Sequence, residues 1–215
     1  MNKKIVFTKL LMFLVVSGFM QAAAAQTYFS GNIGAGLLRD SKLTDDVDAP
    51  GLELGIGFDT GYVFSAAVGR AFPGFRGELE LSYQENDVGN FSLDGITVDA
   101  AVVGISGDSS VLTGMINGYY DLDMGTALTP YISAGVGFSE VDFTFTIDDP
   151  DVGIISEDDS DSAISFQIGV GAGYQISENM VFDLRYRYFT ADPKFGTTSS
   201  SFKNHIFTGG LRINF

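Results

Sequence analysis

Cysteine and tryptophan are absent from the sequence, histidine occurs once, and lysine and arginine together number only 12. Without cysteine there are no disulfide bonds, thiolate metal sites or cysteine nucleophiles. A single histidine excludes a metal site built from several histidines. Acidic residues number 27, for a formal net charge of −15. Nucleic acid is therefore excluded as a partner, because phosphate contacts need a basic face.

Apolar residues and glycine, in contrast, are abundant. Hydrophobic residues make up 45% of the chain and aromatic residues 13%, there are 27 glycines, and charged residues reach only 18%. This composition is too apolar for a disordered chain, and it lacks the Lys, Glu, Ala and Leu surplus of a helical protein. The 215 residues are enough for one domain with a sizeable core, or for two small domains.

The N-terminal segment has the pattern of a secretory signal peptide. Three lysines lie within the first nine residues, an apolar stretch follows over residues 10–20, and alanines at 23–25 form a small-residue cleavage site. A retained membrane anchor is the alternative, but the apolar stretch is shorter than the ~20 residues of a spanning helix. We therefore expect a cleaved signal peptide over residues 1–25 and a mature domain over residues 26–215.

Apolar and polar residues alternate with a period of two through most of the mature chain. In FRGELELSYQ, Phe75, Leu79 and Tyr83 share one face, while Arg76 and Glu78 share the other. The same alternation, which is typical of strands with one apolar face, recurs over residues 29–37, 52–70, 111–121, 132–138, 164–176, 180–189 and 205–215. With residues 52–70 counted as one long strand, about eight strands are expected, each near or above the ~10 residues of a membrane strand.

The connections between these strands alternate strictly in length. Short joins rich in turn-forming residues occur at 71–74, 122–130 and 177–179. Longer polar segments, expected to be loops, occur at 39–51, 85–110, 142–162 and 190–204. An up-and-down barrel with both termini on the short-turn side produces this order.

The direction of the apolar face distinguishes a soluble barrel from a membrane barrel. The polar face carries four positive and four negative charges: Arg76, Glu78, Glu80, Asp121, Asp183, Arg185, Arg187 and Arg212. Balance is required in a narrow, low-dielectric interior, because an unpaired buried charge is costly. If the polar face were instead the outer surface of so acidic a protein, its positive and negative charges would not need to be equal in number. The sequence therefore predicts an all-β fold, an eight-stranded antiparallel up-and-down transmembrane β-barrel with a luminal charge network.

The alternating stretches include GYVFSAAVGRAFPGFRGELELSY, MINGYYDL, YISAGVGFS, GVGAGYQISENMVFDLRYRYF and GGLRINF. They resemble the small eight-stranded outer-membrane barrels of Gram-negative bacteria, of the opacity-protein and surface-antigen type and related in fold to the OmpA transmembrane domain. The resemblance covers residues 26–215 and implies an outer-membrane location, with outer-membrane lipid and lipopolysaccharide as neighbours. It also implies insertion by the barrel-assembly machinery, which looks for a C-terminal strand ending in an aromatic residue. The matching assembly-signal positions are Phe207, Leu211, Ile213 and Phe215.

Several motifs could indicate catalysis or ligand binding, but a structural role explains each of them better. The glycine clusters GNIGAG, SAGVGF and GVGAGYQ complete neither a dinucleotide fingerprint nor a P-loop, and they suit a crowded lumen. The acidic stretch 147–161 fits no calcium-loop frame and is interpreted as a solvated surface loop. Glu78 and Glu80 could form a catalytic carboxylate pair. However, the third and seventh strands of an eight-stranded barrel lie opposite each other, which places this pair against Arg185 and Arg187.

His205 is the only histidine, and a lipid-modifying barrel enzyme would need it together with a serine and an acid. No serine follows two positions later, so His205 is interpreted as a rim residue at the start of the last strand. No catalytic, cofactor-binding or metal site is predicted. The predicted function is structural, with acidic extracellular loops that contact an extracellular ligand and a plugged lumen. The alternatives are a narrow porin-like channel and, ranked last, a lipid-modifying enzyme.

Overall fold

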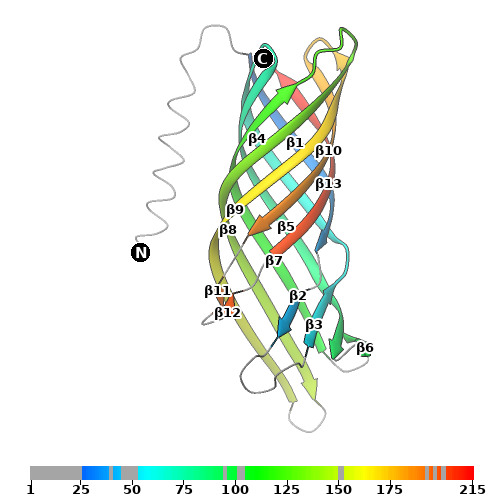
Figure 1. The fold of residues 1–215 in the computed structure, drawn as a ribbon, viewed down its shortest axis with the longest axis vertical. Helices are drawn as coiled ribbons and strands as arrows, with labels where there is room; N and C mark the ends of the chain where they lie inside the picture. Colours follow the sequence, from blue (N-terminus) through cyan, green and yellow to red (C-terminus); the bar gives the residue numbers. More distant parts are fainter. Residues whose placement is uncertain are drawn as a thin grey trace.

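Eight antiparallel strands form the wall of a closed barrel (Figure 1). The computed structural model describes residues 26–38, 41–44, 53–93, 96–100, 105–149, 153–191, 194–195, 198–199 and 202–215. The wall strands are β1 (Gln26–Leu38), β4 (Gly61–Phe72), β5 (Phe75–Leu93), β7 (Ile105–Asp121), β8 (Leu128–Asp149), β9 (Gly153–Ser177), β10 (Met180–Ala191) and β13 (Phe202–Asn214). Each pairs with the next in this order, and the predicted fold class is confirmed.

The barrel closes between its first and last strands. The register of β1 with β13 runs from Tyr28 opposite Asn214 to Leu38 opposite Asn204. This closure leaves neither strand with an open edge along the barrel wall, as a strand in lipid requires. This pairing of the first and last strands completes the predicted eight-stranded barrel.

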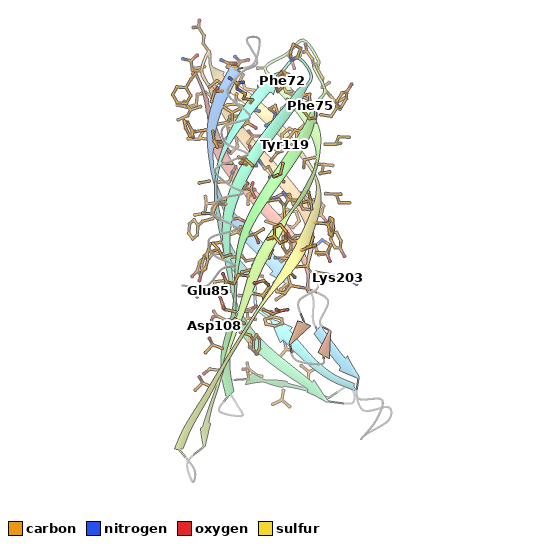
Figure 2. The ribbon with its side chains drawn as sticks, turned by 90° about the vertical axis from the view of Figure 1, so that its left-hand side faces the viewer. Phe72, Phe75, Glu85, Asp108, Tyr119 and Lys203 are labelled. Carbon is orange, nitrogen blue, oxygen red and sulfur yellow. The ribbon has the colours of Figure 1, made fainter. Side chains whose placement is uncertain are left out.

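The apolar faces of the wall strands point outward. Ile168 is 64% exposed and Phe138 58% exposed, whereas Glu78 and Asp183 are fully buried inside. Figure 2 shows the outward side chains along the wall. This arrangement is the reverse of a soluble barrel, where the apolar face fills the interior. The predicted direction of the faces is therefore confirmed.

Short connections gather at one end of the barrel, where Figure 1 also places the C-terminus. β4 joins β5 through a turn at Pro73 and Gly74, and β9 joins β10 through a turn at Glu178 and Asn179. Gly74 has a φ of 74°, a left-handed conformation that glycine adopts without steric cost. Each of these two tight turns reverses the chain and connects two neighbouring antiparallel strands at this end.

No helix within the described ranges is long and apolar enough to cross a membrane.

Residues 52–70 do not form one long strand, so that prediction is wrong. The described part of the segment contains β3 (Glu53–Phe58) and β4, separated at Asp59 and Thr60. β4 pairs with β1 only as far as Gly61 opposite Gly36. Before that point the chain turns away from β1 and pairs with the far end of β5, where the Asp59 amide donates to the Asp87 carbonyl at 2.9 Å.

The long polar segments are also less loop-like than predicted. β5, β7, β8 and β9 all continue past the apolar band, and β8 and β9 stay paired from Leu128 opposite Tyr174 to Asp149 opposite Gly153. The small strands β2 (Ser41–Thr44), β3 and β6 (Ile96–Asp99) extend the sheet beside β5, and β11 (Lys194–Phe195) pairs with β12 (Thr198–Ser199). Polar composition does not end a strand while a neighbour still offers backbone hydrogen bonds.

Glycine at inward positions makes room for large luminal rings. A Cβ atom added at Gly171 would lie 2.5 Å from the Tyr131 ring and 2.5 Å from the Leu184 carbonyl oxygen. The outward Gly31, by contrast, has nothing within 4 Å of an added Cβ. The predicted use of glycine to relieve a crowded lumen is confirmed at Gly171.

Replacing Gly171 with valine is therefore expected to destabilise the folded barrel by about 1–3 kcal/mol, the usual cost of overpacking. Gly31→Val is the matched control, since it adds the same atoms to the open outer face, and we expect a change within about 0.5 kcal/mol. Urea unfolding in detergent micelles, followed by circular dichroism or by gel migration, measures the free energy of unfolding of both variants. Equal losses for the two variants would contradict the crowding explanation.

Candidate functional site

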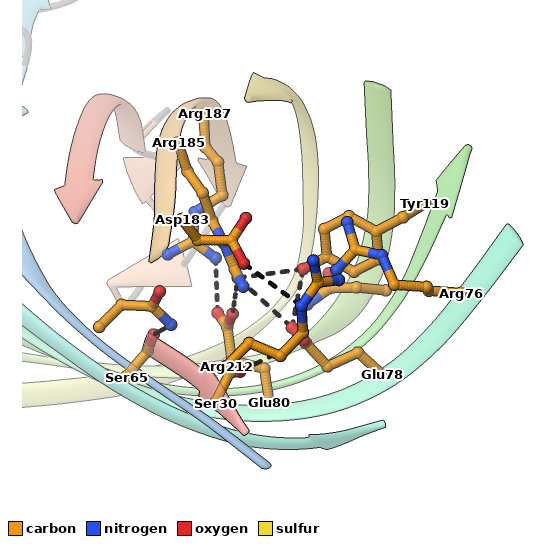
Figure 3. A network of polar contacts seen from close by, with 12 residues as sticks. Ser30, Ser65, Arg76, Glu78, Glu80, Tyr119, Asp183, Arg185, Arg187 and Arg212 are labelled. Atoms are coloured by element: carbon orange, nitrogen blue, oxygen red, sulfur yellow. Dashed lines mark hydrogen bonds and ion pairs between the residues drawn. The ribbon is translucent and has the colours of Figure 1, made fainter. Parts of the chain in front are cut away.

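All eight charges of the predicted luminal network lie at inward positions of four strands. β5 carries Arg76, Glu78 and Glu80, β7 carries Asp121, β10 carries Asp183, Arg185 and Arg187, and β13 carries Arg212. Seven of them are buried, and Asp121 is partly exposed at the end of its strand. Figure 3 shows most of these side chains converging inside the barrel.

Glu78 is the most heavily hydrogen-bonded member of the network. The Tyr119 hydroxyl donates to its carboxylate at 2.7 Å, the Tyr28 hydroxyl at 3.1 Å and the Ser30 hydroxyl at 3.3 Å. An Arg185 guanidinium nitrogen lies 3.5 Å from the same carboxylate. Donors from three strands, β1, β7 and β10, thus surround one fully buried negative charge.

Glu80 links the network across the barrel at its shortest ion pair. The Arg187 NH1 atom lies 2.6 Å from a Glu80 oxygen, and Arg185 NH1 lies 3.5 Å from the other oxygen. Arg187 also donates to Gln167 at 3.4 Å, and Gln167 donates to Asn117 at 2.6 Å. The third and seventh wall strands, β5 and β10, are therefore joined through the lumen.

The end of the network near the short turns combines ion pairs with aromatic rings. Arg76 makes a two-pronged contact with Asp121, with Nε at 2.7 Å from one oxygen and NH2 at 2.9 Å from the other. Its guanidinium carbon lies 4.3 Å from the Tyr119 ring centroid and 4.8 Å from that of Tyr131. Cation–π contact adds to the ion pair at this position.

Asp183 is held less directly than the other carboxylates. Arg212 Nε lies 3.5 Å from one of its oxygens, and neither oxygen has a hydrogen-bond partner among the described residues. The Arg212 guanidinium also lies 5.5 Å from the Tyr28 ring centroid. Each of the other three luminal carboxylates accepts at least one hydrogen bond of 2.7 Å or shorter, and Glu78 and Glu80 sit where β5 faces β10.

An apolar layer lies in the lumen next to the charge network, and sequence analysis does not predict it. Its buried members are Val63, Met115, Ala163, Phe189, Ala191 and Ile206. A cavity of about 10 Å³ beside Arg187 and Gln84 is lined by several of them and is at the lower limit for one water molecule. The sequence does contain a signal for this layer. Val63 and Phe189 are apolar residues at inward positions of strands whose outward face is also apolar.

Amide side chains form a further layer toward the extended strand ends. Asn204 donates to Gln84 at 2.5 Å, and Gln84 donates to Asn86 at 2.6 Å. The Asn86 amide in turn donates to the backbone carbonyls of Gly36 and Asp59, both at 2.9 Å. Asn86 therefore ties the mouth of the barrel to the start of the β3 extension.

His205 lies on the outer face of the barrel. Its Nδ1 atom is 2.8 Å from the Tyr186 hydroxyl, and its ring also contacts that of Tyr188. Within the part of the chain that the structure describes, no cluster of three or more His, Cys, Asp or Glu side chains is arranged to hold a metal ion.

Three of the four predicted assembly-signal residues lie on the outward face of β13, and Phe215 follows directly after the strand. Phe207, Leu211, Ile213 and Phe215 are all exposed, Phe215 to 71%. The Phe215 amide donates to the Thr27 carbonyl at 2.8 Å, and its ring meets that of Phe29 edge-on with centroids 5.6 Å apart. The last residue is thus part of the barrel seam.

Residues 11–215 match the family described as outer membrane protein beta-barrel domain. The chain belongs to this family. It is an outer-membrane β-barrel protein of a Gram-negative bacterium, and the predicted location is confirmed. In such barrels the short turns face the periplasm and the long connections face the outside. The extended ends of β5, β7, β8 and β9 are therefore extracellular.

One sequence relative and two structures of similar fold accompany this match. The outer membrane protein PagN of Salmonella typhimurium is 38% identical over 109 residues, which cover 50% of this chain and 43% of PagN. Neisserial surface protein A has a similar fold, with a TM-score of 0.58 and 16% identity over 89% of this chain and 99% of that structure. The outer membrane protease OmpT of Escherichia coli matches with a TM-score of 0.50 and 14% identity over 89% of this chain and 96% of its own. The chain thus spans less than half of PagN, and the two structures are similar in fold.

Proposed function

We propose that this outer-membrane barrel is a non-catalytic surface protein with a closed lumen, which presents acidic β-hairpins outside the cell. The observation that carries the proposal is the pairing of Glu80 with Arg187 at 2.6 Å, because it joins opposite walls of the barrel. Arg185 lies between Glu78 and Glu80, 3.5 Å from each, and completes the crossing. In a barrel of eight strands, side chains of this size are enough to fill the interior.

The proposal of a closed lumen is supported by several layers of side chains that follow one another along the barrel axis. An ion crossing the barrel would meet the charge network, then the apolar layer around Met115 and Phe189, then the amides of Gln84 and Asn204. Beyond them, the Phe58 and Phe143 rings meet edge-on with centroids 6.3 Å apart. Removing one layer leaves the others in place, so a porin-like channel is the weaker alternative.

The surface role rests on the extracellular strand extensions. Glu140 and Asp142 are exposed on the extended part of β8, beyond the outward apolar band that ends at Phe138. The long β8–β9 hairpin projects from the barrel in Figure 1. A rigid scaffold that holds variable segments outside the membrane is a common support for binding. The negative charge favours cationic partners.

An enzymatic role has no support in the side chains that the structure describes. OmpT is named a protease and shares the fold, but a fold does not determine a reaction. The carboxylates Glu78 and Glu80 are engaged by arginines, and His205 is hydrogen-bonded to Tyr186 on the outer face. We therefore extend the non-catalytic assignment to the whole barrel.

Planar-bilayer recording of the purified protein tests the closed lumen. We expect no stable conductance from the unmodified barrel. A variant with Glu80, Arg187 and Phe189 all changed to alanine is the matched comparison, because it removes the crossing ion pair and part of the apolar layer together. The amide layer and the Phe58–Phe143 contact remain in this variant, so at most small current steps are expected from it. Large, steady current steps from the unmodified protein would refute the proposal.

A further inference from the structure

The outward rim at the extracellular end divides into two sectors of opposite charge. Beyond the apolar band, β5, β7 and β8 carry the outward acidic residues Glu85, Asp87, Asp108, Glu140 and Asp142. Asp87 and Asp108 lie directly opposite each other in the β5–β7 register. On β10 and β13 the outward rim instead carries Lys203, His205 and two tyrosines.

Figure 2 shows Glu85 and Lys203 at a similar level of the barrel, on different sides. Hydrogen bonds donated by the Tyr62 and Tyr83 hydroxyls hold the pKa of the Glu85 carboxyl below its usual range. Glu85 therefore stays negatively charged just beyond the apolar band. An anionic group in the outer leaflet is repelled from this sector and not from β10 and β13.

His205 and Lys203 are arranged side by side along β13. They are two residues apart, which places them about 7 Å apart on the same face of the strand. The Tyr186 and His205 rings are inclined by only 20°, with centroids 6.0 Å apart, and the Tyr188 ring lies 5.3 Å away on the neighbouring strand. Lys203 is exposed opposite Thr190, and it pairs with no carboxylate in the described part of the chain.

We propose that the outward rim of β10 and β13 binds the phosphate of an anionic outer-leaflet glycolipid, with the Lys203 ammonium and His205 Nε2 as its ligands. When the Tyr186 hydroxyl donates to Nδ1, the proton of the neutral imidazole lies on Nε2, which can then donate to a phosphate oxygen. The Lys203 ammonium adds a point charge and further donors.

The neighbouring outward residues explain why the ligand is a lipid rather than a free anion. Phe207 follows His205 on the same face of β13 and is 49% exposed, and Leu184 on β10 is 56% exposed. An amphiphile can place its phosphate at Lys203 and His205 while its acyl chains cover these apolar side chains. Inorganic phosphate would make only the polar contacts. The proposal is independent of whether the lumen conducts.

Native mass spectrometry of the barrel with bisphosphorylated lipid A, and with the same lipid after removal of its phosphates, tests the assignment. The variant with Lys203→Gln and His205→Gln is expected to bind the phosphorylated lipid at least about fivefold more weakly. This is the usual contribution of one lysine near an anionic headgroup. Binding of the dephosphorylated lipid should not change. Lys203→Arg should retain the affinity, since it keeps the charge.

Arg70→Gln is the matched control. Arg70 lies on the outward face of β4 at the periplasmic end, so this substitution also removes one positive charge from the outer wall, but on the side of the opposite leaflet. It is expected to leave lipid A binding unchanged. The proposal is overturned if Arg70→Gln weakens binding as much as the double variant, or if the double variant affects both lipids equally. Displacement of the lipid by millimolar inorganic phosphate would also overturn it. Heat-dependent gel migration confirms that each variant is folded.

Discussion

Replacing Glu78 with alanine is expected to lower the free energy of unfolding of the barrel by about 3–5 kcal/mol, the usual cost of removing one partner from a buried ion pair. The variant leaves the Arg185 guanidinium facing Glu80 alone, and it removes the acceptor of the Tyr28 and Tyr119 hydroxyls. Both hydroxyls would then be buried without this partner, which adds to the loss. Urea unfolding in detergent micelles measures the change.

Three further variants separate the causes. Glu140→Ala removes the same charge from the exposed part of β8 and should change stability by no more than about 0.5 kcal/mol. Glu78→Gln keeps an acceptor for Tyr119 and should cost less than Glu78→Ala. The double variant with Arg185→Ala as well should lose less than the sum of the single losses, because contacting residues are not additive. A Glu78→Ala loss as small as that of Glu140→Ala would show that the network contributes little to stability.

Deleting Phe215 is expected to reduce the amount of barrel assembled in the outer membrane severalfold while costing the assembled barrel only a little stability. The structural loss comprises one edge-on ring contact with Phe29, worth about 0.5–1.5 kcal/mol. It also includes the backbone hydrogen bond to Thr27, worth a similar amount. The assembly loss follows from the resemblance, which implies that the assembly machinery looks for a C-terminal aromatic residue.

Phe29→Ala is the control for this deletion, because it removes the same ring contact and leaves the C-terminal aromatic in place. Folded protein in outer-membrane fractions, measured by gel migration without boiling, should be near normal for Phe29→Ala and low for the deletion. Phe215→Tyr should behave like the unmodified chain. If Phe29→Ala reduces assembly as much as the deletion does, the ring contact rather than the terminal aromatic is responsible.

The strand pattern could be predicted because the alternation of residues with a period of two reports directly which side of a strand meets lipid. Leu184 and Arg185 are neighbours in the sequence, and the pleat alone places them on opposite faces. The same reasoning assigned the eight inward charges to the lumen. It failed between Asp59 and Thr60 because the alternation continues through the break. There β5 remains a backbone partner, while the partner on the other side changes from β1 to β2.

The amino-acid sequence by itself determined the barrel, the direction of its faces and the balance of charge inside it, because these properties follow from local alternation and composition. Only the tertiary structure decided which charges meet, since Glu80 and Arg187 are 107 residues apart and their contact depends on strand order and stagger around the barrel. The tertiary structure also showed the apolar layer around Phe189 and the division of the outer rim into acidic and basic sectors. Both arise from side chains on different strands, and no single stretch of sequence contains them.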